Sequence, residues 1–148
     1  MRRLWLWLPP LVYMTAIFQF SAQPDPLPAI THAVWDKALH VVEYTVLGVL
    51  FCRALNGEGL APLRVALFSI VLTSAYGATD ETHQLFVPYR SAGADDWLAD
   101  CGGAVAGAAL FNTVSRRRHP PRRSPPVQSN QPTAPAARAA RPSASGDR

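Results

Sequence analysis

The sequence predicts an all-α protein, a four-helix transmembrane bundle followed by a disordered basic C-terminal tail. Within residues 1–114, four apolar stretches alternate with short polar segments, and each stretch is close to the roughly 20 residues that span a bilayer core. Residues 115–148 hold eight of the thirteen arginines and carry a net charge of +7, against −3 for residues 1–114. The sequence pI of 9.6 is therefore a property of the tail, which argues against a folded basic domain that binds nucleic acid.

The four expected helices cover residues 4–20, 38–55, 63–78 and 97–114. The first begins with Trp5 and Trp7, a residue type that is enriched at membrane interfaces. Pro62 precedes the third and suits the first turn of a helix. In the fourth, Gly103 and Gly107 form a GxxxG pattern, which allows two helix backbones to approach closely.

The first apolar stretch has an alternative interpretation as a cleaved signal peptide. It has a basic start, an apolar middle and Ser21-Ala22 directly after it. Phe18 and Phe20 stand just before any cleavage point, however, and fit the small-residue processing rule poorly. We therefore expect this stretch to be retained as a transmembrane helix.

The distribution of basic residues predicts the orientation in the membrane, because lysine and arginine near helix ends favour the cytoplasm. In a four-helix topology one end of the bundle collects Arg2, Arg3, Arg53, Arg64 and 116–118. The connections at the other end, 21–37 and 77–96, are acidic. We therefore expect a multi-pass protein of the bacterial cytoplasmic (inner) membrane, with both termini in the cytoplasm.

The expected domain organisation is a transmembrane domain over residues 1–114 and a cytoplasmic tail over 115–148. The tail is rich in Arg, Pro, Ala and Ser, so it has too little apolar area to fold. Its arginines are suited to attract anionic lipid. An equally good interpretation is a stop-transfer anchor with a solvated extension.

The two cysteines, Cys52 and Cys101, lie near opposite ends of the expected helices. At 1.5 Å per residue, Cys52 lies roughly 18 Å along the second helix from His40, far from Cys101. We therefore expect two free thiols rather than a disulfide.

Ionisable residues gather at the expected extracytoplasmic ends of the second, third and fourth helices. Asp36, His40 and either Glu43 or Tyr44 share one face of the second helix, since they recur at helical spacing. The segment 80–84 ends the third helix with a similar polar run. A charged side chain at membrane depth is expensive, so these residues predict a functional site.

These residues resemble the VanZ-like family over about residues 33–112. The resemblance rests on Asp36-Lys37-x-x-His40-x-x-x-Tyr44, Asp80-Glu81-x-His83-Gln84, Pro88-x-Arg90-Ser91 and Asp96-x-x-x-Asp100. It implies a small bacterial integral membrane protein with a role at the cell envelope, and the family's named member is associated with resistance to the glycopeptide antibiotic teicoplanin. The matching positions are Asp36, Lys37, His40, Glu81, Gln84, Arg90, Asp96 and Asp100. Tyr89 stands where the family usually has Gly, and position 100 is Asn in many members.

The first function class is a membrane-embedded hydrolase or transferase that acts on a lipid-linked or headgroup substrate. The candidate catalytic residues are His40, Glu81 and Asp96, with His40 as general base and Glu81 as acid or base. The candidate substrate-binding residues are Asp36, Lys37, Gln84 and Arg90, with Arg90 as an anion clamp. His40, Glu81, Asp96 and His83 also supply donors for a metal, but no diagnostic metal-site spacing such as HExxH is present, so the sequence leaves the cofactor open.

Two further classes need no catalysis. A binding protein would use Arg90 and the acidic residues to recognise a cell-wall precursor or a lipid headgroup. A structural network of the same residues would lock the helix ends together through ion pairs and hydrogen bonds. Lone polar residues inside the helices are expected to form interhelical hydrogen bonds or to lie at the membrane interface: Gln19, Ser69, Thr73 and Asn112.

Overall fold

The chain folds into four α-helices, as the sequence predicted. The structure is a computed structural model that describes residues 1–23, 33–88, 90 and 92–118. The helices are α1 (Arg2–Ser21), α2 (Ala33–Gly57), α3 (Pro62–Gln84) and α4 (Ala94–Arg118), and the described residues include no strand. α2 begins earlier and α3 ends later than expected, because polar residues continue each helix beyond its apolar segment.

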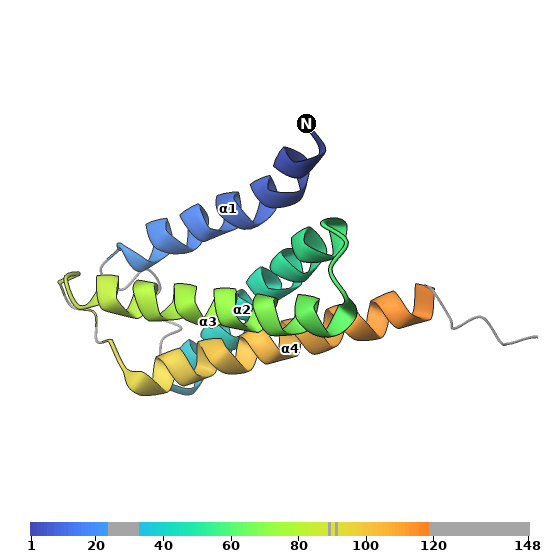
Figure 1. The fold of residues 1–148 in the computed structure, drawn as a ribbon. Helices are drawn as coiled ribbons and strands as arrows, with labels where there is room; N and C mark the ends of the chain where they lie inside the picture. The colour runs from blue at the N-terminus through green and yellow to red at the C-terminus, as the bar shows by residue number, and fades with distance from the viewer. Residues whose placement is uncertain (24–32, 89, 91, 119–148) are drawn as a thin grey trace, which may run out of the picture.

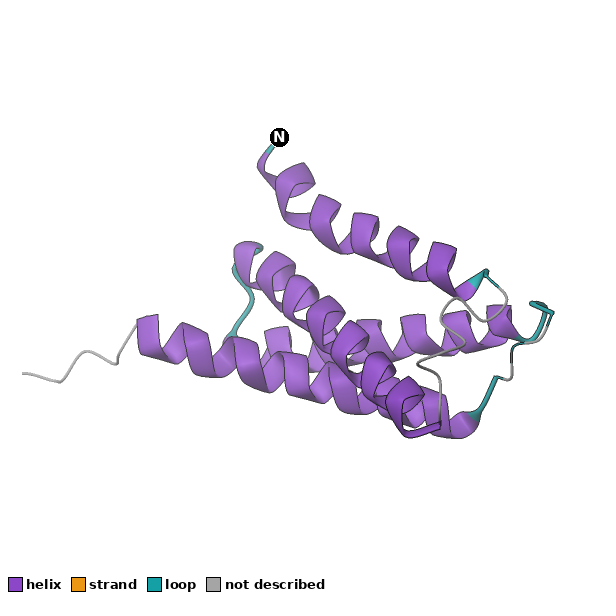
Figure 2. Ribbon diagram, turned by 180° about the vertical axis from the view of Figure 1, so that it is seen from behind, coloured by secondary structure: helices purple, strands orange, loops and turns teal. Residues whose placement is uncertain are grey.

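Successive helices run in opposite directions, so the chain passes four times between the two ends of the bundle (Figure 1). The C-terminal ends of α1 and α3 lie at the same end as the N-terminal ends of α2 and α4. We call this the polar end. α2 and α4 make the most extensive helix–helix contact, whereas α1 contacts α2 and α3 but not α4. Seen from behind, α1 again lies on the opposite side of the bundle from α4 (Figure 2).

Two apolar clusters hold the helices together, and α2 contributes to both. In the first, Ile17 of α1 packs with Tyr44, Leu47 and Phe51 of α2. In the second, Cys52 and Leu55 of α2 pack with Val65 of α3 and Ala108 of α4. α2 is therefore the central helix, and its side chains set the spacing of the other three.

The GxxxG pattern brings α4 against the backbone of α2, as predicted. A Cβ atom at Gly103 would lie 2.6 Å from the carbonyl oxygen of Val41, and one at Gly107 would lie 2.5 Å from that of Thr45. The hydroxyl of Thr45 also donates a hydrogen bond to the Gly103 carbonyl at 3.2 Å. Only glycine fits at the two α4 positions, because backbone atoms of α2 occupy the space.

On α3, large apolar side chains face outward and several small polar side chains face the interior of the bundle. On α3 the large side chains of Leu63, Phe68 and Val71 are exposed, whereas Ser69 and Thr73 are buried. The Ser69 hydroxyl donates to the Gly48 carbonyl at 2.8 Å, which confirms one expected interhelical bond. A water-soluble protein rarely exposes so many large apolar side chains together, so this surface is suited to lipid.

Three of the helical segments are long and apolar enough to cross a membrane: Arg2–Ser21, Lys37–Gly57 and Pro62–Gln84. α4 is less apolar because its first two turns carry Asp95, Asp96 and Asp100. Its 25 residues still extend for about 37 Å, which exceeds the roughly 30 Å of a bilayer core. The acidic half of α4 is thus the part that faces the polar end.

α1 packs as an integral part of the fold. Ile17 is buried, and the Tyr76 hydroxyl of α3 donates to the Met14 carbonyl at 2.6 Å. Ser21 makes a further bond to α3, described below. These contacts join α1 to α2 and α3, and the helix is long and apolar enough to cross a membrane.

Cys52 and Cys101 are free thiols, as expected. α4 continues to Arg118, so residues 115–118 of the expected tail are helical. Residues 119–148, which make up the rest of the expected tail, lie outside the described residues.

Candidate functional site

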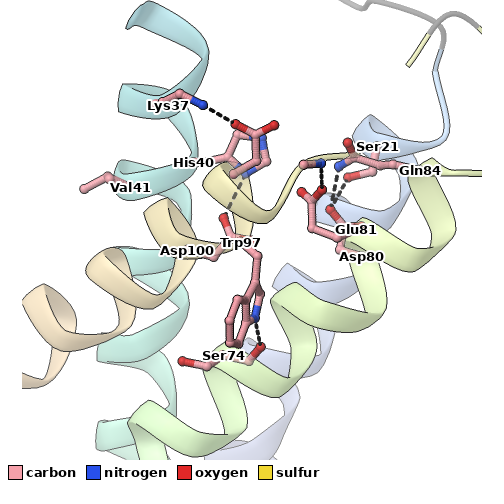
Figure 3. A network of polar contacts seen from close by, with 12 residues as sticks. Ser21, Lys37, His40, Val41, Ser74, Asp80, Glu81, Gln84, Trp97 and Asp100 are labelled. Carbon is pink, nitrogen blue, oxygen red and sulfur yellow. Dashed lines mark hydrogen bonds and ion pairs between the residues drawn. The ribbon is translucent and has the colours of Figure 1, made fainter. Parts of the chain in front are cut away.

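Polar side chains from all four helices meet at the polar end of the bundle (Figure 3). At their centre are His40 of α2, Glu81 of α3 and Asp100 of α4, which we call the buried triad. Nδ1 of His40 lies 2.8 Å from Oδ1 of Asp100. Each of the three residues offers a nitrogen or oxygen atom that lies within 4.8 Å of those of the other two.

The triad is almost completely removed from solvent. His40 is 7% exposed, Glu81 8% and Asp100 0%. Asp100 reaches between α2 and α3 because α3 has Gly77 at the point of contact, where a Cβ atom would lie 2.7 Å from Oδ2 of Asp100. A glycine at this position therefore makes room for a carboxylate in the interior.

Each carboxylate of the triad has one bonded oxygen and one oxygen without a hydrogen-bond partner in the described part of the chain. Oε2 of Glu81 accepts a hydrogen bond from the Gly93 N–H at 3.0 Å, and Oδ1 of Asp100 contacts His40. Oε1 of Glu81 and Oδ2 of Asp100 are buried and lack a partner. A buried polar atom without a partner is costly, so these two oxygens mark a place where a proton, a substrate or a cation is expected to bind.

A second polar group joins α1 to α3 around Asp80. Oδ2 of Asp80 accepts hydrogen bonds from the Ser21 hydroxyl at 2.7 Å and from the Gln84 amide at 3.0 Å. Gln84, which the sequence suggested as a substrate-binding residue, is 3% exposed and holds this internal bond. This bond lies within α3 and supports the Asp80 carboxylate, while the Ser21 hydroxyl provides the link to α1.

A third group joins α2 to α4 at the outer edge of the polar end. The Lys37 ammonium pairs with the carboxylates of Asp95 and Asp96, at 2.9 Å in the case of Asp96. This ammonium lowers the pKa of Asp95 through a hydrogen bond and its charge. Asp96, a candidate catalytic residue by sequence, thus has Lys37 as its partner, while Asp100 one turn deeper contacts His40.

Two further candidates, Arg90 and His83, do not belong to the triad. Arg90 is partly buried, its Nε atom has no hydrogen-bond partner in the described part of the chain, and its guanidinium interacts electrostatically with Glu43. His83 stacks on Phe18 with ring centroids 4.3 Å apart and is not part of the triad. The side chain of Asp36 lies outside the described residues.

The VanZ/LLP1 family model matches residues 3–115 of the chain. The chain belongs to the VanZ/LLP1 family. The match covers α1, α2, α3 and nearly all of α4, and the apolar helices make this VanZ/LLP1 member a membrane protein. Searches of curated proteins and of solved structures each returned no match.

Two contacts of this VanZ/LLP1 protein were not predicted from the sequence. Asp100 is the partner of His40, and Asp80 accepts a hydrogen bond from Ser21 of α1. A signal for Asp100 exists in the helix register. Asp100 follows Asp96 by four residues toward the middle of α4, and His40 follows Lys37 by three residues toward the middle of α2. Asp100 and His40 therefore lie at similar depths in the bundle. No comparable signal links Ser21 to Asp80, because the packing of α1 on α3 cannot be read from either helix alone.

Proposed function

We propose that this protein is a membrane-embedded hydrolase or transferase that acts on the headgroup of a lipid-linked substrate at the cell envelope. The buried triad is the observation that supports this proposal. Three ionisable side chains come from three helices, and two of their carboxylate oxygens lack partners. A network whose purpose is only structural gains stability when each member is satisfied.

The proposed chemistry is general acid–base catalysis. Asp100 orients the imidazole of His40 through the 2.8 Å contact at Nδ1. His40 then removes a proton from water or from a substrate hydroxyl, and Glu81 holds or delivers the proton needed by the leaving group. Arg90 binds a phosphate or carboxylate of the headgroup, for which a guanidinium is well suited.

The location follows from the charges of the two ends. Arg2, Arg3 and Arg64 lie at the end opposite the triad, and basic residues favour the cytoplasm. We therefore place the triad at the extracytoplasmic face of the bacterial cytoplasmic membrane and both termini in the cytoplasm. The tail beyond α4 then faces the anionic cytoplasmic leaflet.

A second candidate function, a structural lock, is favoured by the groups around the triad. Asp80 has donors on both α1 and α3, and Lys37 pairs with two aspartates of α4. These contacts hold the helix ends in place, and we assign them that role. The triad differs because it gathers three ionisable side chains whose donor atoms lie within 4.8 Å of one another, whereas Asp80, whose Oδ1 also lacks a partner among the described residues, lies outside that cluster.

The proposed enzyme is tested with Glu81→Gln, which retains shape and removes the ionisable group. The purified protein is incubated with total lipid extract from its own membrane, and loss or transfer of headgroups is followed by mass spectrometry. We expect wild-type protein to convert at least one lipid class and Glu81→Gln to lower the rate by about 10²-fold or more, with membrane level and melting temperature unchanged.

Gln84→Leu is the matched control on the same helix, because Gln84 lies one turn away and contacts Asp80 instead of the triad. It is expected to lower the melting temperature while activity per folded molecule is retained. Equal headgroup profiles with and without wild-type protein would contradict the proposal. A Glu81→Gln protein that loses both membrane level and thermal stability would favour the structural lock.

Growth in the presence of teicoplanin is the cellular test of this proposal, because the family's named member is associated with resistance to this antibiotic. We propose that expression of the wild-type chain raises tolerance and that Glu81→Gln does not. The minimal inhibitory concentration measures this directly, with membrane levels matched by immunoblot.

A further inference from the structure

We propose that the buried triad is a binding site for one divalent transition-metal ion, with Zn²⁺ as the preferred ion. This inference rests on the proposed function in that it names the cofactor of the same site. It differs from the ligand set suggested by the sequence, since Asp100 replaces Asp96 and His83 is excluded.

The donor set fits such an ion. One imidazole and two carboxylates are ligands that zinc and manganese accept, and three protein ligands leave an open position for water or substrate. The donor atoms already lie within 4.8 Å of one another. A tetrahedral ion with bonds of roughly 2.0–2.2 Å needs donors about 3.4 Å apart, so the donor atoms must move closer by up to about 1.4 Å to complete the site.

The second observation is the pair of oxygens without partners. Oε1 of Glu81 and Oδ2 of Asp100 belong to side chains that are more than nine-tenths buried. In Figure 3 the Glu81 carboxylate extends from α3 toward His40. The Gly93 N–H occupies the other oxygen of Glu81, which leaves Oε1 as the donor toward the interior.

Charge balance points the same way. Two buried carboxylates require compensation, the Lys37 ammonium is already engaged by Asp95 and Asp96, and a protonated His40 would balance one carboxylate only. A divalent cation neutralises both triad carboxylates at once. With an ion bound, His40, Glu81 and Asp100 would be its ligands, and the ion would supply the activation of water that the metal-free scheme above assigns to His40.

The metal content of the purified protein tests the proposed site without requiring catalytic activity. The protein is purified in mild detergent through an affinity tag that contains no histidine, dialysed against micromolar Zn²⁺ and then against buffer, and analysed by mass spectrometry of the metals. We expect near one zinc per chain in the wild type. Glu81→Gln and Asp100→Asn are each expected to reduce the content by tenfold or more.

Asp96→Asn is the matched control, because Asp96 is an acidic residue of the same helix that pairs with Lys37. It is expected to retain the wild-type metal content. Equal loss in Asp96→Asn and Asp100→Asn would overturn the triad as the ligand set, and a wild-type protein without metal after dialysis would overturn the site altogether.

The wild type also allows a test that depends on no variant. Chelation is expected to lower its melting temperature and added Zn²⁺ to restore it, since a ligand that binds only the folded state stabilises that state. A melting temperature that ignores both treatments contradicts the proposal. Bound zinc without headgroup conversion would contradict only the enzyme, whereas conversion by metal-free protein would contradict only the metal site.

Discussion

Buried carboxylates in this protein are accommodated in two different ways. Asp80 receives two hydrogen bonds at one oxygen, from Ser21 and Gln84, and thereby joins two helices. Asp100 contacts His40 and keeps its other oxygen unpartnered. Each aspartate keeps one buried oxygen without a hydrogen-bond partner among the described residues, but Asp100 lies in a cluster with His40 and Glu81, whereas Asp80 joins α1 to α3. The role that we assign to a buried aspartate therefore depends on which ionisable groups surround it and not on its residue type alone.

Removal of the Ser21 hydroxyl tests the structural bond. Ser21→Ala is expected to lower the free energy of unfolding by about 1 kcal/mol, because Asp80 loses a buried donor. Thermal unfolding in detergent measures the change. Thr15→Ala is the control on the same helix, since the Thr15 hydroxyl is exposed and donates to the Leu11 carbonyl of its own helix. A melting temperature equal in all three proteins would show that α1 gains no stability from Asp80.

Helix α4 shows how one element serves both packing and chemistry. Its first two turns carry the aspartates of the polar end, and its middle carries the glycines that contact α2. Close approach at Gly103 and Gly107 holds α4 against α2, which carries His40. The distance between His40 and Asp100 thus depends on small residues one or more turns away from either.

The glycines of α4 provide a sharp comparison. Gly103→Ala places a Cβ atom against the Val41 carbonyl and is expected to cost about 1–3 kcal/mol of stability through overpacking. Gly102→Ala is the control, because a Cβ atom there has no neighbour within 4 Å. Alanine at position 102 should be neutral or slightly stabilising, as expected for a helix interior. Melting temperatures that fall equally in both variants would contradict the close α2–α4 packing.

The whole molecule separates two chemically different ends. The polar end holds the triad and an acidic edge, and the opposite end holds Arg2, Arg3 and Glu58, where Arg3 pairs with Glu58 at 3.2 Å. Apolar helix surfaces lie between the ends and face lipid. This arrangement lets a membrane protein keep ionisable groups at one interface while its exterior stays apolar.

Orientation can be tested with single cysteines in a variant that lacks Cys52 and Cys101. Asp95→Cys at the polar end is expected to react with a membrane-impermeant thiol reagent added to intact cells or spheroplasts. Arg116→Cys, at the exposed end of α4, is expected to react only after the membrane is opened. The reverse pattern of labelling would place the triad in the cytoplasm and exclude an outer-leaflet substrate.

The sequence was sufficient for the helices, because apolar segments of membrane length and the turns between them are local signals. The sequence predicted the helix ends less well, because α2 includes Lys37 and α3 extends to Gln84, both beyond the apolar segments. It also identified His40 and Glu81 as candidates, since an ionisable side chain at membrane depth stands out in a linear pattern.

The sequence by itself determined the number of helices, the apolar exterior and the separation of charge between the two ends, all of which depend on composition and spacing along one helix. Only the tertiary structure decided that Asp100 rather than Asp96 contacts His40, and that Ser21 of α1 donates to Asp80 of α3. Those choices depend on the relative depth and rotation of neighbouring helices. Close contacts at Gly77, Gly103 and Gly107 set that geometry, and contacts between distant segments are not encoded in any local pattern.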